Sequence, residues 1–310
     1  MITDNLYQQI LIDPASSGNN ELFIVSGYAS ATFLNKHISE ITNKYPEIRL
    51  NLIIGMHQKR NDHSAYINIK NLYPNFHGYY YSGRPGVHSK TYCWVKAGVP
   101  CIGFSGSANY SQYGFENSMQ QNQMVEDDPS TIKNYFQTLL KNSLKIEDYV
   151  PSEDDSIDPI NVEGSVAPGS IEWIKYNDSA RISLLMENGE TASRAHLNWG
   201  QRPELGREPN QAYLPVPSGA QIEGFLPERN FRFTLITDDK KTFDCVRAQD
   251  NGKAIETTNN NSELGKYLRD RLNLDLGSFV NKEDLIKYGR TDFILRKLDD
   301  ETFFFDFSKL

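Results

Sequence analysis

Short apolar runs and helically spaced apolar residues alternate along the first 150 residues of the chain. Four runs rich in β-branched and aromatic residues predict strands, at residues 22–28, 49–55, 88–95 and 100–106. Residues 30–45 have the spacing of an amphipathic helix, and Asp128 followed by Pro129 is typical of a helix N-cap and first turn. This second helix is expected to bury five side chains, those of Ile132, Phe136, Leu139, Leu140 and Leu144. The order of elements predicts an α/β domain, with a mixed sheet flanked by helices.

Residues 151–166 show no apolar periodicity and are rich in proline, serine, glycine and acidic residues, which predicts a linker. We therefore expect one domain at residues 1–150 and another at residues 167–310. Apolar runs in the second domain predict seven strands, at residues 170–176, 181–186, 212–217, 231–237, 242–248, 292–298 and 302–307. Two short helices are expected to begin at Ser262 and at an Asn281–Asp284 capping box, the second ending at Gly289. Many short strands with few helices predict a mainly-β pseudobarrel with short helices.

Charge and composition narrow the class of protein. Residues 1–150 hold 12 Lys and Arg and 12 Asp and Glu, so the whole net charge of −8 belongs to residues 151–310. Five of these acids lie in the predicted linker, at Glu153, Asp154, Asp155, Asp158 and Glu163. An acidic total argues against a protein that coats nucleic acid, although local basic patches still bind DNA.

The chain also lacks the marks of membrane, secreted and metal-binding proteins. No apolar run approaches the roughly 20 residues that span a bilayer. The N-terminus has neither the basic start nor the apolar core of a signal peptide. The cysteines Cys93, Cys101 and Cys245 have no metal-binding spacing. We expect reduced thiols, a cytoplasmic protein, no membrane partner and no metal or other cofactor.

Candidate chemistry begins at "VHSKTYCW", residues 87–94. His88 and Lys90 are two apart on a predicted strand, so both side chains are expected on one face. Alone, this pair is typical of many solvated strands. The stretch "SGSANYS", residues 105–111, follows at the end of the next predicted strand. Its small residues let backbone amides face an anion, and Asn109 adds a neutral donor. Imidazole, ammonium, hydroxyl and amide together favour phosphoryl transfer by covalent catalysis on histidine, without a divalent ion.

The H-x-K and G-S-x-N pair resembles the signature of the phospholipase D superfamily. In that family two motif copies form one active site, where one histidine attacks phosphorus and the other protonates the leaving oxygen. The resemblance implies a phospholipase-D-like fold for residues 1–150, with His88 as nucleophile or acid. It implies phosphate binding by Lys90, Ser107 and Asn109. The chain holds one copy of H-x-K, which implies a homodimer with one motif from each subunit.

The match departs from the family pattern at two positions. The aspartate expected five residues after the lysine is replaced by Val95. At the position where nucleases of this family carry a glutamate after the asparagine, the stretch "NSMQQNQMVEDD", residues 117–128, has amides at residues 120–123, and the next acid is Glu126. Three alternatives stay open: an amide, with Gln123 as the candidate and Gln121 beside it, orients the histidine; Glu126 does so; or the site is weakened. Three other histidines in this half, His57, His63 and His77, are interpreted as bystanders in polar loops.

Two polar segments of the second domain, residues 193–217 and 248–262, contain the side chains that read base edges. The candidate DNA contacts are Arg194, His196, Asn198, Trp199, Gln201, Arg202, Arg207, Gln249, Asn251, Lys253 and Asn260. Other interpretations stay open for three of these features. In these interpretations, the Trp199 ring packs at the end of the barrel, and Arg207 pairs with Glu204 or Glu208. The asparagines 259–261 form a turn and a helix cap. Two such segments projecting from a barrel suit the walls of a major groove.

The strings "NWGQR" and "NQAYLPVP" and the closing "YGRTDF" and "FFFDF" resemble the C-terminal half of NgoFVII-type restriction endonucleases. Those enzymes join a phospholipase-D-like nuclease domain to a DNA-binding pseudobarrel of the plant B-three type. The resemblance implies metal-independent, sequence-specific cleavage of double-stranded DNA, and in some relatives a separate helicase-like NTPase partner takes part. Two alternatives stay open: a DNA-binding protein with a degenerate nuclease domain, and a phospholipid phosphodiesterase.

Overall fold

The computed structural model describes residues 1–56, 62–116, 121–151, 157, 164, 166–174, 178–217 and 220–309. The chain divides into two compact units, Met1–Ser156 and Ile157–Leu310, which are described separately below. Most of the predicted linker, residues 151–166, lies outside the described residues, as does His57.

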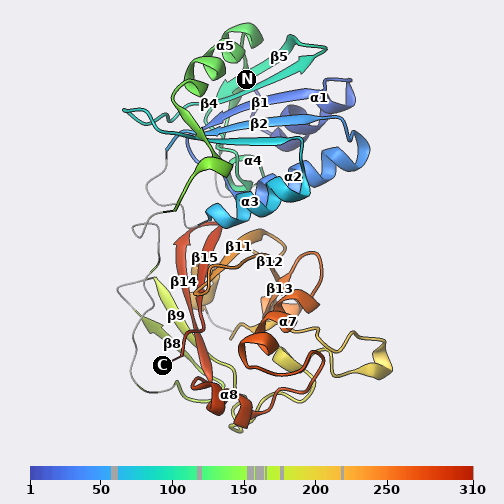
Figure 1. The fold of residues 1–310 in the computed structure, drawn as a ribbon, viewed down its shortest axis with the longest axis vertical. Coiled ribbons are helices and arrows are strands. Elements are labelled where there is room, and N and C mark those ends of the chain that lie inside the picture. Colours follow the sequence, from blue (N-terminus) through green and yellow to red (C-terminus); the bar gives the residue numbers. More distant parts are fainter. Residues whose placement is uncertain are drawn as a thin grey trace. The chain divides into compact units, whose positions relative to one another are not determined.

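A seven-stranded mixed sheet forms the first unit (Figure 1). Its strands are β1 (Glu21–Ser26), β2 (Arg49–Ile54), β3 (Phe76–Tyr81), β4 (Lys90–Lys96), β5 (Val99–Gly106), β6 (Met124–Glu126) and β7 (Ser143–Lys145). They lie in the order β6-β5-β4-β1-β2-β3-β7, in which β1, β2 and β3 are parallel and the other pairs antiparallel. The four predicted strands are confirmed, whereas β3, β6 and β7 were not predicted.

Helices cover both faces of this sheet. They are the π-helix η1 (Tyr7–Ile12), α1 (Asp13–Ser16), α2 (Ala31–Lys44), α3 (His63–Leu72), α4 (Gln112–Phe115), α5 (Pro129–Leu140) and the short 3-10 turn η2 (Ile146–Asp148). Leu22 and Ile24 of β1 pack in the core cluster that contains α2 and α3. Val25 packs in a separate cluster with Phe136 of α5, as the period of two along a strand requires. The sheet therefore has two buried faces, and the α/β prediction is confirmed.

Both predicted helices of this unit form, the second with the expected Asp128 cap and the first with a Ser30 cap that was not predicted. The Ser30 side chain accepts a hydrogen bond from the amide of Phe33 at 3.3 Å, and Asp128 accepts one from the amide of Thr131 at 2.7 Å. One predicted core residue of the second helix is wrong: Leu144 is 40% exposed. It lies in β7 because the helix ends at Leu140 and the chain turns back to pair with β3.

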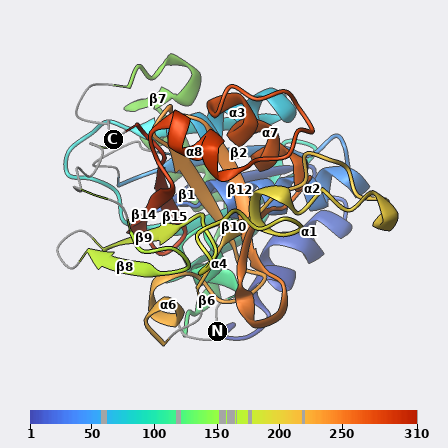
Figure 2. The same ribbon diagram turned by 90° about the horizontal axis from the view of Figure 1, so that it is seen from below.

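The second unit is mainly β, with an eight-stranded sheet. Its strands are β8 (Ile171–Ile174), β9 (Ser179–Ser183), β10 (Leu214–Pro215), β11 (Arg232–Thr237), β12 (Thr242–Ala248), β13 (Ala254–Thr257), β14 (Asp292–Asp299) and β15 (Thr302–Asp306). They lie in the order β10-β13-β12-β11-β15-β14-β9-β8, and β8, β9, β14 and β15 are seen side by side in Figure 2. Among the described strands of this second unit, only β11 and β15 pair in parallel. The mainly-β prediction is confirmed.

In the described part of this unit, three α-helices and three 3-10 turns interrupt the strands. They are α6 (Ala220–Phe225), α7 (Ser262–Arg271) and α8 (Lys282–Tyr288), with η4 (His196–Asn198), η5 (Pro203–Leu205) and η6 (Asp250–Gly252). The capping box is confirmed, since Asn281 accepts from the Asp284 amide at 3.0 Å and Asp284 accepts from the Asn281 amide at 2.9 Å. The helix ends at Gly289, whose φ of 105° suits glycine. Ser262 is not a cap: Asn261 holds that position, and the Ser262 hydroxyl donates to Glu208.

A buried ionic cluster joins three strands of the second unit, β9, β14 and β15. Arg181 pairs with Asp292 at 2.9 Å, and Arg290 pairs with Asp292 at 3.0 Å and with Asp306 at 3.2 Å. All four side chains are buried. Buried charges are tolerated when they are paired and hydrogen-bonded, so this cluster fixes β9, β14 and β15 to one another.

Membrane-spanning segments were also sought among the described residues. No helix there is both long enough and apolar enough to cross a bilayer.

Candidate active site and DNA-binding residues

The strand register of the first unit brings the two candidate motifs to one edge of the sheet. Ser26, the last residue of β1, lies opposite Lys90, the first residue of β4. Thr91 lies opposite Ser105, and Gly106 at the end of β5 lies opposite Met124 at the start of β6. The residues around His88 and the loop after Gly106 are therefore neighbours.

His88 is exposed and immediately precedes β4, so the prediction that it lies on the strand is wrong. Its side chain nevertheless meets that of Lys90, whose Nζ lies 3.0 Å from His88 Nε2 and donates to the His88 carbonyl at 2.7 Å. Because an ammonium group only donates, Nε2 is the acceptor in this contact. The contact places an imidazole nitrogen directly beside the Lys90 cation.

Burial and close packing fix this pair. The Lys90 side chain is only 8% exposed, and burial lowers its pKa. A Cβ atom added to Gly27 would lie 2.9 Å from His88 Cδ2 and 3.2 Å from His88 Cα, so only glycine fits there without moving the histidine. The glycine in "SGY" at the end of β1 is thus part of the site.

The second motif is held by the segment that follows it in sequence. The Ser107 hydroxyl donates to Asn122 Oδ1 at 3.1 Å and accepts from the Gln123 amide at 3.0 Å. Asn109 Oδ1 accepts a hydrogen bond from the Tyr28 amide at 3.3 Å. Ser107 is exposed and Asn109 half-buried, so both side chains are accessible to a ligand.

Tyr28 joins the two motifs and was not predicted. Its amide binds Asn109, and its ring packs edge-on against the ring of His88, with 5.9 Å between centroids. The side chain is 51% exposed. The only signal in the sequence is its place at the end of a predicted strand, which does not by itself say which strand lies beside it.

Gln121, Gln123 and Glu126 are the three candidates for the role of the missing glutamate. Gln123 contacts Ser107 only through backbone atoms: the Gln123 amide donates to the Ser107 hydroxyl, and the Ser107 amide donates to the Gln123 carbonyl at 2.9 Å. The Gln123 side chain is exposed. Gln121 is exposed as well. Glu126 lies opposite Phe104, at the end of β6 away from Gly106. Asn122 is one of several amides in residues 117–128 and was not singled out as a candidate. Its side chain is the one that binds the motif serine, Ser107.

Two of the histidines interpreted as bystanders do not lie in loops. His63 is the buried first residue of α3 and contacts the Tyr80 hydroxyl at 3.1 Å, and His77 lies in β3. Across the described ranges, no three His, Cys, Asp or Glu side chains gather as a metal-binding group.

In the second unit, one candidate DNA contact is a buried anchor. Asn198 is 0% exposed, and its amide nitrogen donates to the carbonyls of Ala192 at 2.9 Å and Val280 at 2.8 Å. Its oxygen accepts from the Val280 amide at 2.8 Å. No base edge can reach it, so the structure contradicts the prediction that Asn198 contacts DNA. Gln201 is half-buried, and its amide nitrogen is bound by the carbonyls of Pro209 and Gly277.

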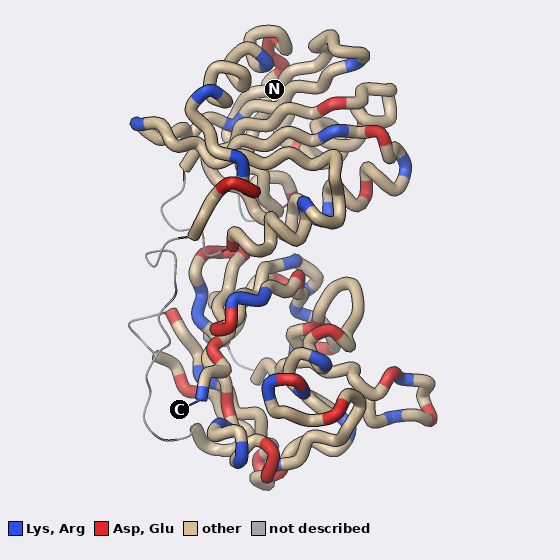
Figure 3. The backbone as a smooth tube through the Cα atoms, in the orientation of Figure 1, with Lys and Arg blue, Asp and Glu red and all other residues tan. Residues whose placement is uncertain are grey.

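The basic residues of residues 193–217 differ in their contacts. Arg194 forms an exposed ion pair with Glu204. Arg207 pairs with neither glutamate considered for it; its guanidinium lies 3.9 Å from the centroid of the half-buried Trp199 ring and donates to Gln211 at 3.3 Å. Arg202 has no side-chain hydrogen bond or ion pair with the described residues. Basic and acidic residues are interspersed along this unit, as Figure 3 shows.

The second polar segment, residues 248–262, contains a strand that was not predicted. This strand, β13, lies in the middle of the segment. Before it, the Gln249 side chain donates to Glu256 at 2.6 Å. Asn251, Lys253 and Asn260 are exposed. Asn260 accepts from the Ser262 amide at 2.9 Å, as expected for the turn interpretation.

His196 is the most unusual of the candidate DNA contacts. It is half-buried with a φ of 51°, in the left-handed region that non-glycine residues rarely adopt. Its Nδ1 is buried and has no hydrogen-bond partner among the described residues. Burial, reinforced by the charge of Lys253, lowers its pKa to about 4, so the ring is neutral near pH 7.

Solved structures with a likeness to the chain include three proteins from bacteria. NucT from Helicobacter pylori is 22% identical over 44% of this chain and 87% of its own, with a TM-score of 0.33. Nuc from Salmonella typhimurium, a phospholipase D family member, is 14% identical over the same shares, with a TM-score of 0.34. Polyphosphate kinase from Porphyromonas gingivalis is 12% identical over 50% of this chain and 24% of its own, with a TM-score of 0.33. No curated protein matches the chain.

Two sequence families match the chain in the same order as its two units. Residues 4–150 match the NgoFVII restriction endonuclease N-terminal PLD domain, and residues 173–299 match the NgoFVII C-terminal B3-like DNA-binding domain. Together the two matches take in most of the chain. The chain therefore belongs to the NgoFVII restriction endonuclease family and is a site-specific DNA endonuclease.

Proposed function

We propose that this endonuclease cuts double-stranded DNA without a metal ion, through a phosphohistidine on His88, in an active site shared by two copies of the chain. The observation that carries the proposal is the 3.0 Å contact between Lys90 Nζ and His88 Nε2. That contact holds a cation beside the proposed nucleophile, where it would bind a non-bridging phosphate oxygen during attack.

The proposed chemistry has two balanced steps. His88 Nε2 attacks the scissile phosphorus, the P–N bond forms, and the bond from phosphorus to the 3′ oxygen breaks. The second subunit's copy of the same histidine gives its proton to that oxygen. Water then gives a proton to that second histidine and attacks the phosphorus, the P–N bond breaks and releases His88, and the product carries a 5′ phosphate. Lys90, Ser107 and Asn109 would hold the non-bridging oxygens throughout.

Accessible groups at the sheet edge support this assignment. The exposed Ser107 and the half-buried Asn109 supply neutral donors, and the buried Lys90 supplies the charge. These are groups that bind phosphate oxygens directly. Gln123 is proposed only as a backbone support for Ser107, since its side chain is exposed and its amide is engaged.

A shared site is proposed because the mechanism needs two histidines and the chain has one H-x-K. The B3-like domain would select the DNA sequence, through exposed or half-buried members of the two polar segments. We propose Arg194, Trp199, Arg202, Arg207, Asn251, Lys253 and Asn260 for this role, and Gln201 and Gln249 as supports beside them. A helicase-like NTPase partner stays a prediction.

Incubation of the purified chain with mixed-sequence DNA in EDTA tests the proposal. We expect discrete fragments from the wild type and none from His88→Ala, because the variant has no nucleophile. His77→Ala, which removes an imidazole from β3, is the matched control and should still cut. Intact DNA with a retained gel shift would favour a binding protein with a degenerate nuclease domain. Hydrolysis of phospholipid vesicles without DNA cleavage would favour a phospholipid phosphodiesterase.

Subunit mixing tests the shared site separately. If each cut needs His88 from both subunits, an equal mixture of wild-type and His88→Ala chains that exchange freely leaves only about a quarter of dimers active. Activity that falls only by half would show that one subunit suffices. Sedimentation of the wild type should give the mass of two chains.

A further inference from the structure

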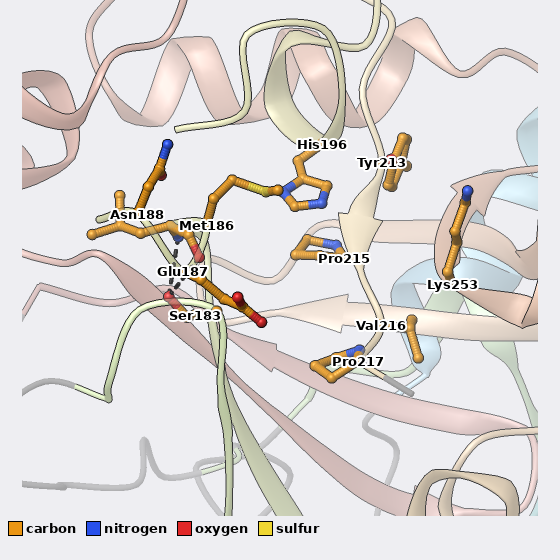
Figure 4. Close-up of a pocket in the computed structure, with 12 residues that line it drawn as sticks. Ser183, Met186, Glu187, Asn188, His196, Tyr213, Pro215, Val216, Pro217 and Lys253 are labelled. Atoms are coloured by element: carbon orange, nitrogen blue, oxygen red, sulfur yellow. Dashed lines mark hydrogen bonds between the residues drawn. The ribbon is translucent and has the colours of Figure 1, made fainter. Parts of the chain in front are cut away.

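A cavity of about 450 Å³ opens between the two polar segments of the second unit (Figure 4). His196 and Tyr213 come from the first segment and Lys253 from the second, and the loop around Met186 supplies the opposite wall. In Figure 4 the His196 ring lies between Met186 and Tyr213 and faces the open space. The volume falls in the range of small-molecule binding sites, roughly 300–1,000 Å³.

The walls of this cavity combine flat apolar surfaces with a polar rim. The rings of His196 and Tyr213 pack edge-to-face with 5.5 Å between centroids, and Pro215 and Val216 of the β10 region line the space beside them. Asn188 and Lys253 are exposed at its border. Such a lining fits a planar ring that has a hydrogen-bonding edge and is attached to an anionic backbone.

The backbone holds His196 in place from both sides. Its carbonyl accepts from the amides of Tyr213 and Trp199, each at 3.2 Å. The buried Asn198 fixes the same turn to Val280, and Arg269 donates to the carbonyl of Leu197 at 3.2 Å. The residue is thus kept in a left-handed conformation by its surroundings. Strain of this kind accumulates at ligand sites, where it presents a side chain that the fold itself does not use.

The hydrogen-bonding capacity of His196 is unused within the described part of the chain. Neither ring nitrogen has a hydrogen-bond partner there, and the ring is neutral because burial and the charge of Lys253 oppose its protonation. A neutral imidazole offers one donor and one acceptor, as the edges of nucleobases do. Lys253 lies where it could meet a phosphate of the same nucleotide.

We propose that this cavity receives one nucleobase unstacked from the bound DNA, with His196 reading its edge and Lys253 binding its phosphate. The proposal rests on the DNA-binding function of this domain and deepens it. Unstacking a base costs a few kcal/mol, which stacking against aromatic rings and a filled cavity would offset. The extruded base would be a position of the recognition site that the protein reads outside the double helix.

The test places 2-aminopurine at each position of the site mapped from the cleavage ends, and uses His88→Ala chains so that the DNA stays intact. We expect fluorescence to rise strongly at one position when the protein binds. Adding His196→Gly should abolish the rise and weaken DNA affinity about 5- to 150-fold, the effect of losing one good base-edge contact. Glycine adopts the positive φ without strain, so the variant is expected to fold, as its thermal unfolding will show.

Lysine substitutions supply the matched control. Lys253→Ala should weaken binding and reduce the fluorescence rise, whereas Lys287→Ala, which removes an exposed lysine of α8, should change neither. Absence of a rise at every position, or a rise that persists in His196→Gly, would overturn the proposal while site-specific cleavage stands. Failure of the wild type to bind or cut DNA would instead overturn the proposed function, and this proposal with it.

Discussion

Replacing Asn198 by alanine tests whether this residue anchors the fold or contacts DNA, the role that the sequence indicated. The substitution removes three hydrogen bonds, two to the carbonyls of Ala192 and Val280 and one from the Val280 amide. Val280 is fully buried and Ala192 nearly so, so water cannot replace the lost partner. The Val280 carbonyl still accepts from the Thr191 hydroxyl at 2.9 Å, so two groups lose their partner, the Ala192 carbonyl and the Val280 amide. Each unsatisfied buried group costs about 1–3 kcal/mol, which puts the loss at about 2–6 kcal/mol of unfolding free energy. That is a large share of the roughly 5–15 kcal/mol of a typical domain.

Thermal unfolding of the full chain, followed by calorimetry, measures this loss. A domain of this size shifts by about 2–4 °C per kcal/mol, so the transition of the second unit should fall by roughly 4–24 °C. Asn259→Ala, the same substitution at an exposed position, should shift it by no more than about 0.5 kcal/mol. An Asn198→Ala protein with unchanged unfolding but weakened DNA binding would refute the assignment of Asn198 as an anchor.

Three further predictions concern the close approach at the active site, the buried charges and the dependence on pH. Gly27→Ala should slow DNA cleavage about 10- to 100-fold in single-turnover assays with DNA affinity unchanged, because the new Cβ displaces His88. Unchanged cleavage would contradict the close packing of Gly27 against His88. Asp292→Ala should cost about 3–5 kcal/mol in urea unfolding, because it leaves the buried Arg181 without its carboxylate and Arg290 with Asp306 alone. The control Asp300→Ala, at a carboxylate that is 58% exposed, should cost less than about 1 kcal/mol. Burial lowers the pKa of His37 to about 4, so the unfolded chain binds an extra proton between pH 6.5 and 4 and stability falls on acidification. Between pH 7.5 and 5 we expect a loss of about 2 kcal/mol from this residue, absent in His37→Gln.

The elements that the sequence predicted are those with strong local signals. The caps Ser30, Asp128 and Asn281 precede periodic apolar residues, and all three begin helices in the structure. The paired motifs around His88 and Asn109 were recognised because their spacing is that of a known family. Their meeting at one sheet edge followed from the expectation that the two strands are neighbours, and the register of β4 and β5 agrees with it.

The features that escaped prediction depend on contacts between distant residues. Asn198 resembles a base-reading amide in sequence, and only the position of Val280, 82 residues further on, makes it an anchor. Tyr28 contributes to the site because β1 pairs with β4. β13 was hidden within a polar segment, since four residues between turns carry too little periodicity to be distinguished from a loop. Local patterns record propensity and capping, whereas pairing and burial are set by the whole fold.

Isolation of the covalent intermediate tests the central claim most directly. The wild-type chain is mixed with end-labelled DNA in EDTA, quenched during the first turnover, and examined for DNA bound to protein through a phosphorus–nitrogen bond. We expect a transient adduct that maps to His88, is absent from His88→Ala, and decays as the 5′-phosphate product appears. Cleavage with no adduct at any time, or cleavage only after a divalent ion is added, would contradict the mechanism.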